Sequence, residues 1–194
     1  MIRSCLGISF IIVSSYWQLN STGHQPRSNS TDSTEYLTQA IQFIKSVKQV
    51  ELNEKSFVLA DQPADIHGFD CLSDLLADTT TLSDNERIFV ISSSNKSYIK
   101  QWRKDFFDDV TIIPSDTIKL IFGKDPFDDW NYFYEHYGPS FNSFSAPIFF
   151  RDYTFCLFYS DNSCGMLCGT GNLSLFQRKN NEWKLVKTYC EWIS

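Results

Sequence analysis

The sequence has 194 residues, of which 42% are hydrophobic and 16% aromatic, and its formal net charge is −6. A chain of this length and composition buries a core of about one domain, which excludes disorder along its whole length. Nucleic-acid binding is excluded as well, because it needs clustered basic side chains, whereas the Lys and Arg residues here are scattered and outnumbered.

The N-terminal segment 1–15 predicts a secretory signal peptide. Arg3 gives a positive start, residues 5–13 form an uncharged apolar run, and Val13 and Ser15 suit a signal-peptidase site. The run is too short to span a bilayer, and no Leu-x-x-Cys lipobox follows it. The alternative is a buried N-terminal helix or strand. We expect an exported protein, periplasmic or secreted, with no transmembrane span after signal removal.

Residues 16–33 are polar and lack apolar periodicity, which predicts a flexible spacer before a single domain over 34–194. Asp32 and Glu35 have the spacing of a capping box at a helix start. The residues expected to dock this helix on the core recur at helical spacing, with Ala40 and Phe43 flanking them: Leu37, Ile41, Ile44 and Val47.

Between residues 56 and 122, short apolar runs alternate with helical patterns, as in parallel βαβ units. The predicted strands are Ser56–Ala60, Ile88–Ser92 and Val110–Ile113. The predicted helices are Cys71–Ala77, Ser97–Phe107 and a helix capped by Ser115.

An aromatic-rich helix is predicted next, with Asp125 as N-cap, Pro126 in the first turn and Gly138 as the stop. Its expected buried face carries four aromatic residues: Phe127, Trp130, Tyr134 and Tyr137.

Alternating apolar residues then predict an antiparallel β-meander over 146–193, with a tight turn at residues 179–182. The predicted strands are Ala146–Phe150, Thr154–Ser160, Asn172–Arg178 and Trp183–Ile193. The expected fold class is α+β, with N-terminal helices and short strands followed by this meander, on which the aromatic-rich helix packs.

The segment 128–194 carries several motifs in a fixed order, listed here with their residues: W-x2-FY at 130–134, S-x-PIF at 145–149, CGxLCGxG at 164–171, WK at 183–184 and WIS at 192–194. With these motifs the chain resembles a family of uncharacterised exported proteins and lipoproteins of Bacteroides- and Flavobacterium-type bacteria. The resemblance implies a location in the bacterial envelope and no catalytic residues. The absent lipobox is a departure from many members.

The loop between Cys164 and Cys168 is the candidate functional feature. Gly165, Gly169 and Gly171 flank the two cysteines and let the backbone turn tightly. A structural disulfide is the favoured prediction, because exported cysteines can oxidise. Free thiols, a metal site or a redox pair remain alternatives.

The other cysteines allow a second bridge between Cys156 and Cys190, which both lie in predicted strands. Buried free thiols are equally compatible with those positions. Removal of Cys5 with the signal leaves an odd number of cysteines, so at least one stays free or pairs with another chain. Cys71 is the candidate for the unpaired one.

No catalytic residue, cofactor site or metal site is predicted. Zinc sites commonly combine two close pairs of ligands, and the sequence has one close cysteine pair. The spacings of a phosphate loop and of a G-x-S-x-G elbow are missing, and nothing in the sequence places His67 or His136 beside a cysteine.

The leading hypothesis is a non-catalytic envelope protein that binds another envelope protein or a small ligand. The competing hypothesis is an exported thiol-dependent enzyme or redox protein that uses Cys164 or Cys168. A third hypothesis follows from the aromatic residues between Phe122 and Tyr159, which can form a sugar-binding platform or a ligand cleft instead of core alone.

Overall fold

The structure is a computed structural model that describes residues 29–194, except 69–70, 95–97 and 124–125. The predicted signal peptide, Cys5 and most of the predicted spacer lie outside the described residues. The last part of that spacer is helical, because α1 (Asn29–Val47) begins before Asp32.

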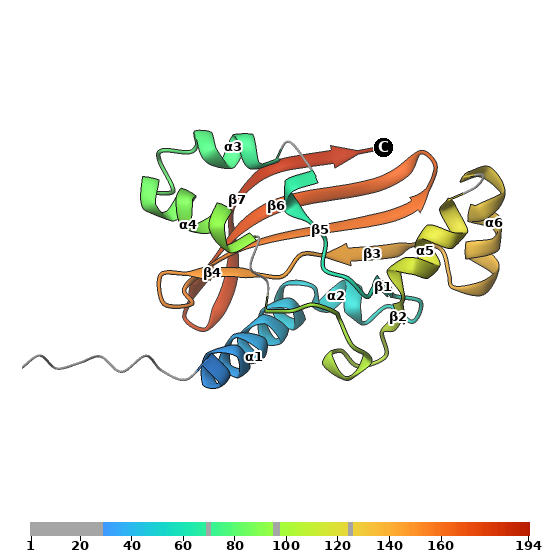
Figure 1. Cartoon of the computed structure of the whole chain (residues 1–194), viewed down its shortest axis with the longest axis horizontal. Coiled ribbons are helices and arrows are strands. Elements are labelled where there is room, and N and C mark those ends of the chain that lie inside the picture. The colour runs from blue at the N-terminus through green and yellow to red at the C-terminus, as the bar shows by residue number, and fades with distance from the viewer. Residues whose placement is uncertain (1–28, 69–70, 95–97, 124–125) are drawn as a thin grey trace, which may run out of the picture.

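The predicted α+β class is confirmed: a mixed seven-stranded sheet carries helices on both faces (Figure 1). The strands are β1 (Val58–Ala60), β2 (Thr111–Ile113), β3 (Phe141–Phe144), β4 (Ile148–Phe150), β5 (Phe155–Gly165), β6 (Cys168–Lys179) and β7 (Glu182–Ile193). Their order is β2-β1-β3-β5-β6-β7, and β4 pairs with β5 beside β3. Strand β1 runs parallel to β2 and β3, whereas the remaining pairs are antiparallel.

The predicted C-terminal meander is confirmed for β5, β6 and β7. Asn180 and Asn181 join the last two strands with φ values of 52° and 64°, the left-handed conformation of a two-residue hairpin turn. Strands β5 and β6 extend to the Cys164–Cys168 loop, further than predicted. Strand β3 was not predicted, because its pairing depends on β1 and β5, which lie far from it in the sequence.

The helices lie in three places around the sheet (Figure 1). They are α1, α2 (Gln49–Leu52), α3 (Cys71–Ala77), α4 (Asp84–Ser94), α5 (Ser115–Phe122) and α6 (Pro126–His136), with short 3-10 helices at Ile66–Gly68 and Lys104–Phe106. Helix α1 packs on one face, α3 and α4 lie over the other, and α5 and α6 lie near the parallel strands. The predicted helices at 71–77 and from residue 115 are confirmed.

Two predicted elements are wrong. Residues 88–92 belong to helix α4 and not to a strand. The helix start is fixed by Ser83, whose backbone N–H and hydroxyl both donate to Glu86 Oε2, at 2.9 and 2.8 Å. Residues 98–107 form only the short 3-10 helix in place of the predicted α-helix, because the Trp102 N–H donates to Asp61 O and holds this segment against the end of β1.

Ser115 is the first residue of α5, not its cap. Pro114 precedes it as the N-cap, and both the backbone N–H and the hydroxyl of Ser115 donate to Asp61 Oδ1, each at 2.7 Å. Gln101 Nε2 donates to the other carboxylate oxygen at 2.6 Å. Asp61 therefore fastens α5 and the segment around residue 101 to the end of β1.

The core has one cluster on each face of the sheet, because side chains alternate along the strands. From β5, Cys156 and Phe158 face α1, whereas Leu157 and Tyr159 face α3 and α4. Phe43 of α1, which was expected to flank the docking face of this helix, is fully buried in the first cluster.

The aromatic-rich helix α6 packs mainly on the parallel strands. Trp130 and Phe133 form a third cluster with Val58 and Ile113, so the buried face contains Phe133. Tyr134, predicted to be buried, is exposed, and its hydroxyl donates to Cys164 O at 2.7 Å. Helix α6 therefore meets the meander at the tip of the β5–β6 hairpin.

We expect the variant Gly171→Ala to lower the free energy of unfolding by about 2 kcal/mol, because it overpacks a tight contact. A methyl group at Gly171 would lie 2.6 Å from Trp192 Cε2 and 2.8 Å from the Tyr159 hydroxyl. The Trp192 indole is fixed there by its hydrogen bond to Tyr159, at 2.9 Å. Urea denaturation measures the loss. Gly169→Ala is the matched control. Its expected loss of stability is smaller, because a methyl group at Gly169 would lie no closer than 3.0 Å to its neighbours.

Candidate functional site

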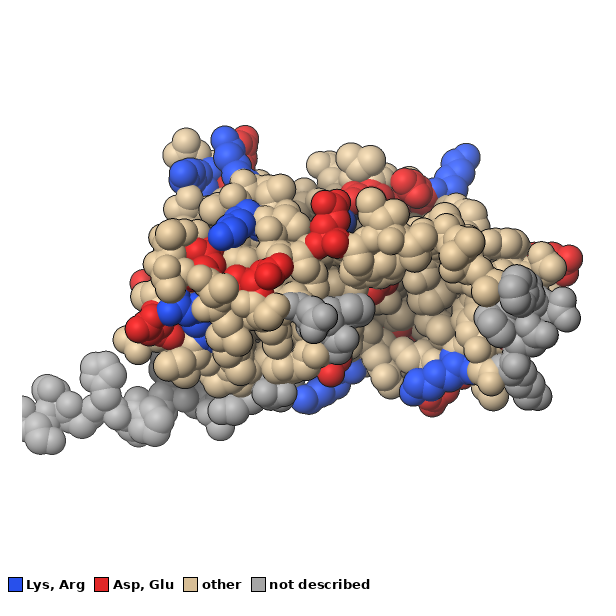
Figure 2. All heavy atoms as spheres, turned by 90° about the horizontal axis from the view of Figure 1, so that it is seen from above, with Lys and Arg blue, Asp and Glu red and all other residues tan. Residues whose placement is uncertain are grey.

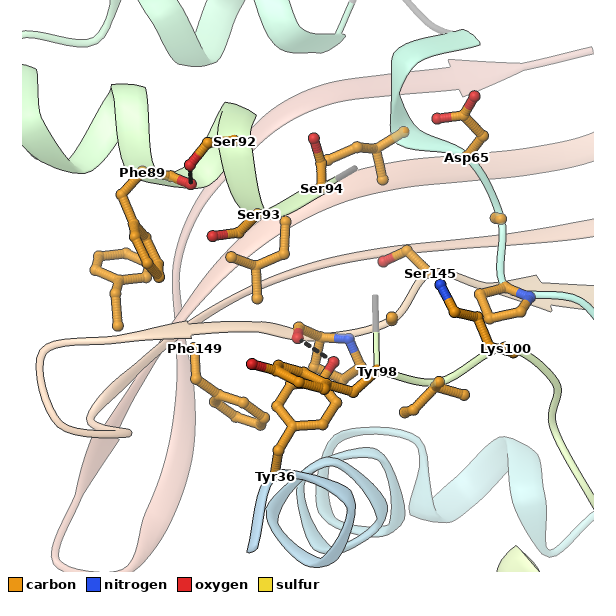
Figure 3. Close-up of a pocket in the computed structure, with 18 of the residues that line it drawn as sticks. Tyr36, Asp65, Phe89, Ser92, Ser93, Ser94, Tyr98, Lys100, Ser145 and Phe149 are labelled. Atoms are coloured by element: carbon orange, nitrogen blue, oxygen red, sulfur yellow. Dashed lines mark hydrogen bonds between the residues drawn. The ribbon is translucent and has the colours of Figure 1, made fainter. Parts of the chain in front are cut away.

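A cleft of about 1110 Å³ lies between α1 and α4, around β4 (Figure 3). Aromatic side chains from distant parts of the chain line it: Tyr36, Phe89, Tyr98, Phe149, Phe150 and Tyr153. The volume is slightly above the range of about 300–1,000 Å³ that is common for small-ligand sites, and the lining combines apolar rings with polar groups, as such sites do.

Tyr36 and Tyr98 form one wall of the cleft. Their ring centroids are 5.1 Å apart, and the Tyr36 ring meets Phe149 edge-on at 6.0 Å. The Tyr36 hydroxyl donates to Pro147 O at 2.7 Å, and burial raises the pKa of Tyr36 above its ordinary value. Tyr36 is therefore a fixed, neutral support, and Tyr98 lies against it with 60% of its surface exposed.

Helix α4 forms the opposite wall, where Phe89 is 44% exposed and Ser92, Ser93 and Ser94 follow it (Figure 3). The hydroxyls of Ser92 and Ser94 donate to the backbone carbonyls of Phe89 and Ile91, at 2.9 and 2.7 Å. Because the Ser92 hydroxyl gives its hydrogen to the backbone, its lone pairs remain available to accept from a ligand.

Ser94 Oγ also lies 2.6 Å from His67 Nε2, a contact that the sequence did not indicate. Which of these two atoms donates depends on the tautomer of His67, and the Ser94 hydroxyl is also within hydrogen-bond distance of Ile91 O. Asp65 accepts from the backbone N–H of His67 at 2.9 Å. This contact leaves Asp65 bonded to the backbone, unlike the acid of a catalytic triad, which bonds to the ring. The contact fastens α4 to the segment around residue 66.

Charged side chains of both signs line the cleft, and those in the described part of the chain are three carboxylates and one ammonium: Glu35, Asp65, Asp152 and Lys100. All four residues are exposed. On the wider face that carries α3 and α4, acidic and basic side chains are interspersed and no continuous basic patch is visible (Figure 2).

An ion pair between Glu86 and Arg151 holds the α4 wall against the turn after β4. Arg151 donates through Nε to Oε1 at 2.5 Å and through Nη2 to Oε2 at 2.9 Å. It also donates to Thr81 O at 3.1 Å. The hydrogen bond from Arg151 lowers the pKa of Glu86 to about 2.

We expect the variant Glu86→Gln to lose about 1–2 kcal/mol of stability at pH 7, discounted because Arg151 is more than a third exposed. Since the pKa of Glu86 is lowered by folding, from 4.5 to about 2, the stabilisation is complete above pH 4.5 and disappears as the pH falls toward 2. The difference in free energy of unfolding between the wild type and Glu86→Gln, measured by urea denaturation, should therefore be large at pH 7 and small at pH 2.5. A difference independent of pH would contradict the role of the ion pair.

The predicted pair Cys164 and Cys168 is disulfide-bonded at the tip of the β5–β6 hairpin. Leu167 inside the loop is 88% exposed, and a methyl group at Gly165 would lie 3.2 Å from the Tyr134 hydroxyl. Gly169 and Gly171 leave room for Trp192 on the neighbouring strand. In this oxidised form the loop is a closed surface feature without a free thiol.

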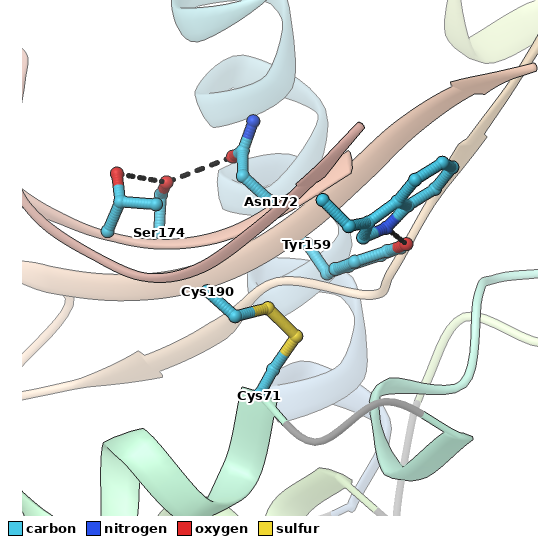
Figure 4. The surroundings of a disulfide bond; sticks show 7 residues. Cys71, Tyr159, Asn172, Ser174 and Cys190 are labelled. Atoms are coloured by element: carbon cyan, nitrogen blue, oxygen red, sulfur yellow. Dashed lines mark hydrogen bonds between the residues drawn. A yellow bond between two sulfur atoms is a disulfide. The ribbon is translucent and has the colours of Figure 1, made fainter. Parts of the chain in front are cut away.

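The predicted bridge between Cys156 and Cys190 is wrong, and so is the prediction that Cys71 is unpaired. Cys190 of β7 is bonded to Cys71 of α3 (Figure 4). Cys156 and Cys190 cannot pair because they lie on opposite faces of the sheet. Cys190 packs with the cluster under α3, whereas Cys156 lies in the cluster under α1. Cys156 stays free, and burial raises its pKa well above the ordinary value, so it remains a protonated thiol.

Within the described ranges, no group of three or more His, Cys, Asp or Glu residues is arranged to hold a metal ion. In the same part of the chain, no helix has both the length and the hydropathy needed to cross a membrane.

No protein-family model matches the chain, and no curated protein or solved structure is significantly similar to it. The class of protein is therefore defined by the fold and the cleft: an α+β domain with a mixed sheet, two disulfides and an aromatic-lined cleft. The resemblance of segment 128–194 to exported proteins of Bacteroides-type bacteria stays a prediction.

Proposed function

We propose that this protein is an exported, non-catalytic binding module and that the cleft between α1 and α4 is its ligand site. The observation that carries the proposal is the aromatic lining, in which Tyr98 and Phe89 expose 60% and 44% of their surfaces to the cleft region. Aromatic rings gain stability from burial, so two exposed rings on facing walls offer a ligand a large area to cover.

The cysteines support the exported location. Disulfides persist in oxidising compartments and are rare in the cytosol, and two of them join cysteines of the described chain. An envelope or secreted location, as implied by the resemblance and by the predicted signal peptide, agrees with this chemistry.

A binding role is favoured over catalysis by the state of the reactive side chains. Asp65 accepts from the backbone N–H of His67 and not from its ring, so it does not complete a Ser–His–Asp triad with Ser94. Cys164 and Cys168 are bonded to each other, and Cys156 is buried. A thiol enzyme would first need a reductant to open the hairpin loop.

Ligand-dependent thermal stabilisation tests the proposal. At a ligand concentration one hundred times Kd we expect a gain of about 2.7 kcal/mol, which corresponds to a rise in Tm of about 5–10 °C. The variants Tyr98→Ala and Phe89→Ala should remove this rise. Tyr132→Ala is the matched control, because Tyr132 is a similarly exposed ring on α6, outside the cleft lining. A rise that survives both cleft variants would place the ligand elsewhere and overturn the proposal.

A further inference from the structure

We propose that the ligand of the cleft is an uncharged saccharide, with one sugar ring seated on the exposed side of Tyr98. The inference rests on the proposed function of the cleft and adds the chemical class of the ligand. It is argued from the ring platform, the hydroxyl groups and the balance of charge in the cleft.

Tyr98 has the geometry of a stacking platform. Its ring contacts Tyr36 in a tilted arrangement, with centroids 5.1 Å apart and ring planes at 48°, and Tyr36 is fixed by its bond to Pro147 O. The remaining surface of Tyr98 is open toward the cleft (Figure 3). The face of an aromatic ring is electron-rich and attracts the weakly positive C–H groups of a sugar ring. A supported tyrosine also loses little conformational entropy when a ligand covers it.

The polar groups of the cleft include several acceptors, which suits a ligand rich in hydroxyl donors. The Ser92 hydroxyl gives its hydrogen to the backbone and keeps lone pairs free. The exposed carboxylates of Glu35 and Asp152 are acceptors as well, and Lys100 supplies a donor for the ring and hydroxyl oxygens of a sugar.

The charges disfavour other ligands of similar size. Among the described lining residues three carboxylates outnumber one ammonium, and the whole chain is acidic, which disfavours phosphorylated, sulfated or uronate ligands. A fatty acyl chain would remove serine hydroxyls and charged groups from water without new partners. A quaternary ammonium needs rings around one centre, whereas Tyr36, Tyr98 and Phe149 pack on one another.

Isothermal titration of the full exported chain tests the inference. The probes are neutral oligosaccharides of glucose, xylose, mannose and N-acetylglucosamine, polygalacturonate fragments, a sulfated glycan, choline and a medium-chain fatty acid. We expect binding of at least one neutral oligosaccharide, with an affinity that does not change between 50 and 500 mM salt. Tyr98→Ala should weaken this binding about tenfold, which equals the value of one lost aromatic contact. Tyr98→Phe should retain it within about threefold, because stacking needs the ring and not the hydroxyl. Tyr132→Ala should have no effect.

The outcomes separate the two proposals. Binding of choline, the fatty acid or an acidic glycan alone, abolished by Tyr98→Ala, overturns the saccharide inference and supports the cleft as a ligand site. Binding of a neutral oligosaccharide that is unchanged in Tyr98→Ala and Phe89→Ala overturns the placement in the cleft, and the proposed function with it. Absence of binding for every probe overturns the saccharide inference. The proposed function is then tested by the ligand-dependent rise in Tm and its loss in Tyr98→Ala and Phe89→Ala.

Discussion

Replacing Cys71 and Cys190 together with serine is expected to lower the free energy of unfolding by about 4–5 kcal/mol and Tm by about 10–15 °C. The bridge joins residues separated by 119 positions, so it removes much of the conformational freedom of the unfolded chain. It also ties α3 to β7 across the sheet face that carries α4. Thermal and urea denaturation of the oxidised proteins measure the effect.

The matched control is the double variant of Cys164 and Cys168 to serine. Its bridge spans only 4 positions in sequence, so the expected loss is about 2 kcal/mol. Equal losses for the two double variants, or no loss for the first, would contradict the assignment of Cys71–Cys190 as the main covalent constraint.

The variant Asp78→Asn is expected to lose about 3 kcal/mol at pH 7, because Asp78 is buried and the substitution leaves its several donors facing an uncharged amide. Lys187 Nζ and the Tyr189 hydroxyl both donate to Asp78 Oδ2 at 2.9 Å. The other oxygen accepts from the backbone N–H groups of Thr80 and Thr81, each at 3.0 Å. Burial alone would raise the pKa of Asp78, but the bonds from Lys187, Thr80 and Thr81 outweigh it and hold the pKa well below 3.8.

The pH dependence gives this prediction a second measurement. A carboxylate whose pKa is lowered by folding stabilises the protein fully above its unfolded value of 3.8 and loses that contribution as the pH falls further. The difference between wild type and Asp78→Asn should therefore be constant from pH 7 to 5 and shrink below pH 3.8. Asp74→Asn, an exposed position on α3 just before Asp78, should change stability by less than about 0.5 kcal/mol. A loss of similar size at Asp74 would contradict the role of the buried network.

Local patterns in the sequence predicted the elements whose structure is determined locally. The α3 segment, the start of α5, the Asn180–Asn181 turn and the alternating strands of the meander follow from helix-start residues, turn residues and side-chain periodicity. Helix α4 was misread as a strand because the apolar run Ile88–Ser92 outweighed the Ser83–Glu86 capping box just before it. That box was the signal that could have corrected the prediction.

The cleft could not be predicted, because its residues come together only in the folded chain. Tyr36, Phe89, Tyr98 and Phe149 lie on four different segments, and each has an ordinary local context. The aromatic platform expected from residues 122–159 contributes only one wall, through β4 and the following turn. The cysteine pairing was misassigned for a similar reason: the choice between Cys71 and Cys156 depends on which face of the sheet Cys190 occupies.

The two disulfides are nested, since Cys164–Cys168 lies between the two ends of Cys71–Cys190. A chain that enters an oxidising compartment from its N-terminus therefore exposes Cys71 to Cys156, Cys164 and Cys168 before Cys190 arrives. Each of these three thiols is a non-native partner that can bond to Cys71 before Cys190 enters the compartment. For a chain exported as proposed, a Cys71 that has bonded to one of these thiols reaches Cys190 only by thiol–disulfide exchange, a step of seconds to hours that an isomerase accelerates. Cys156 remains unpaired in the folded protein, where its burial in the core keeps the thiol from reacting with the disulfides.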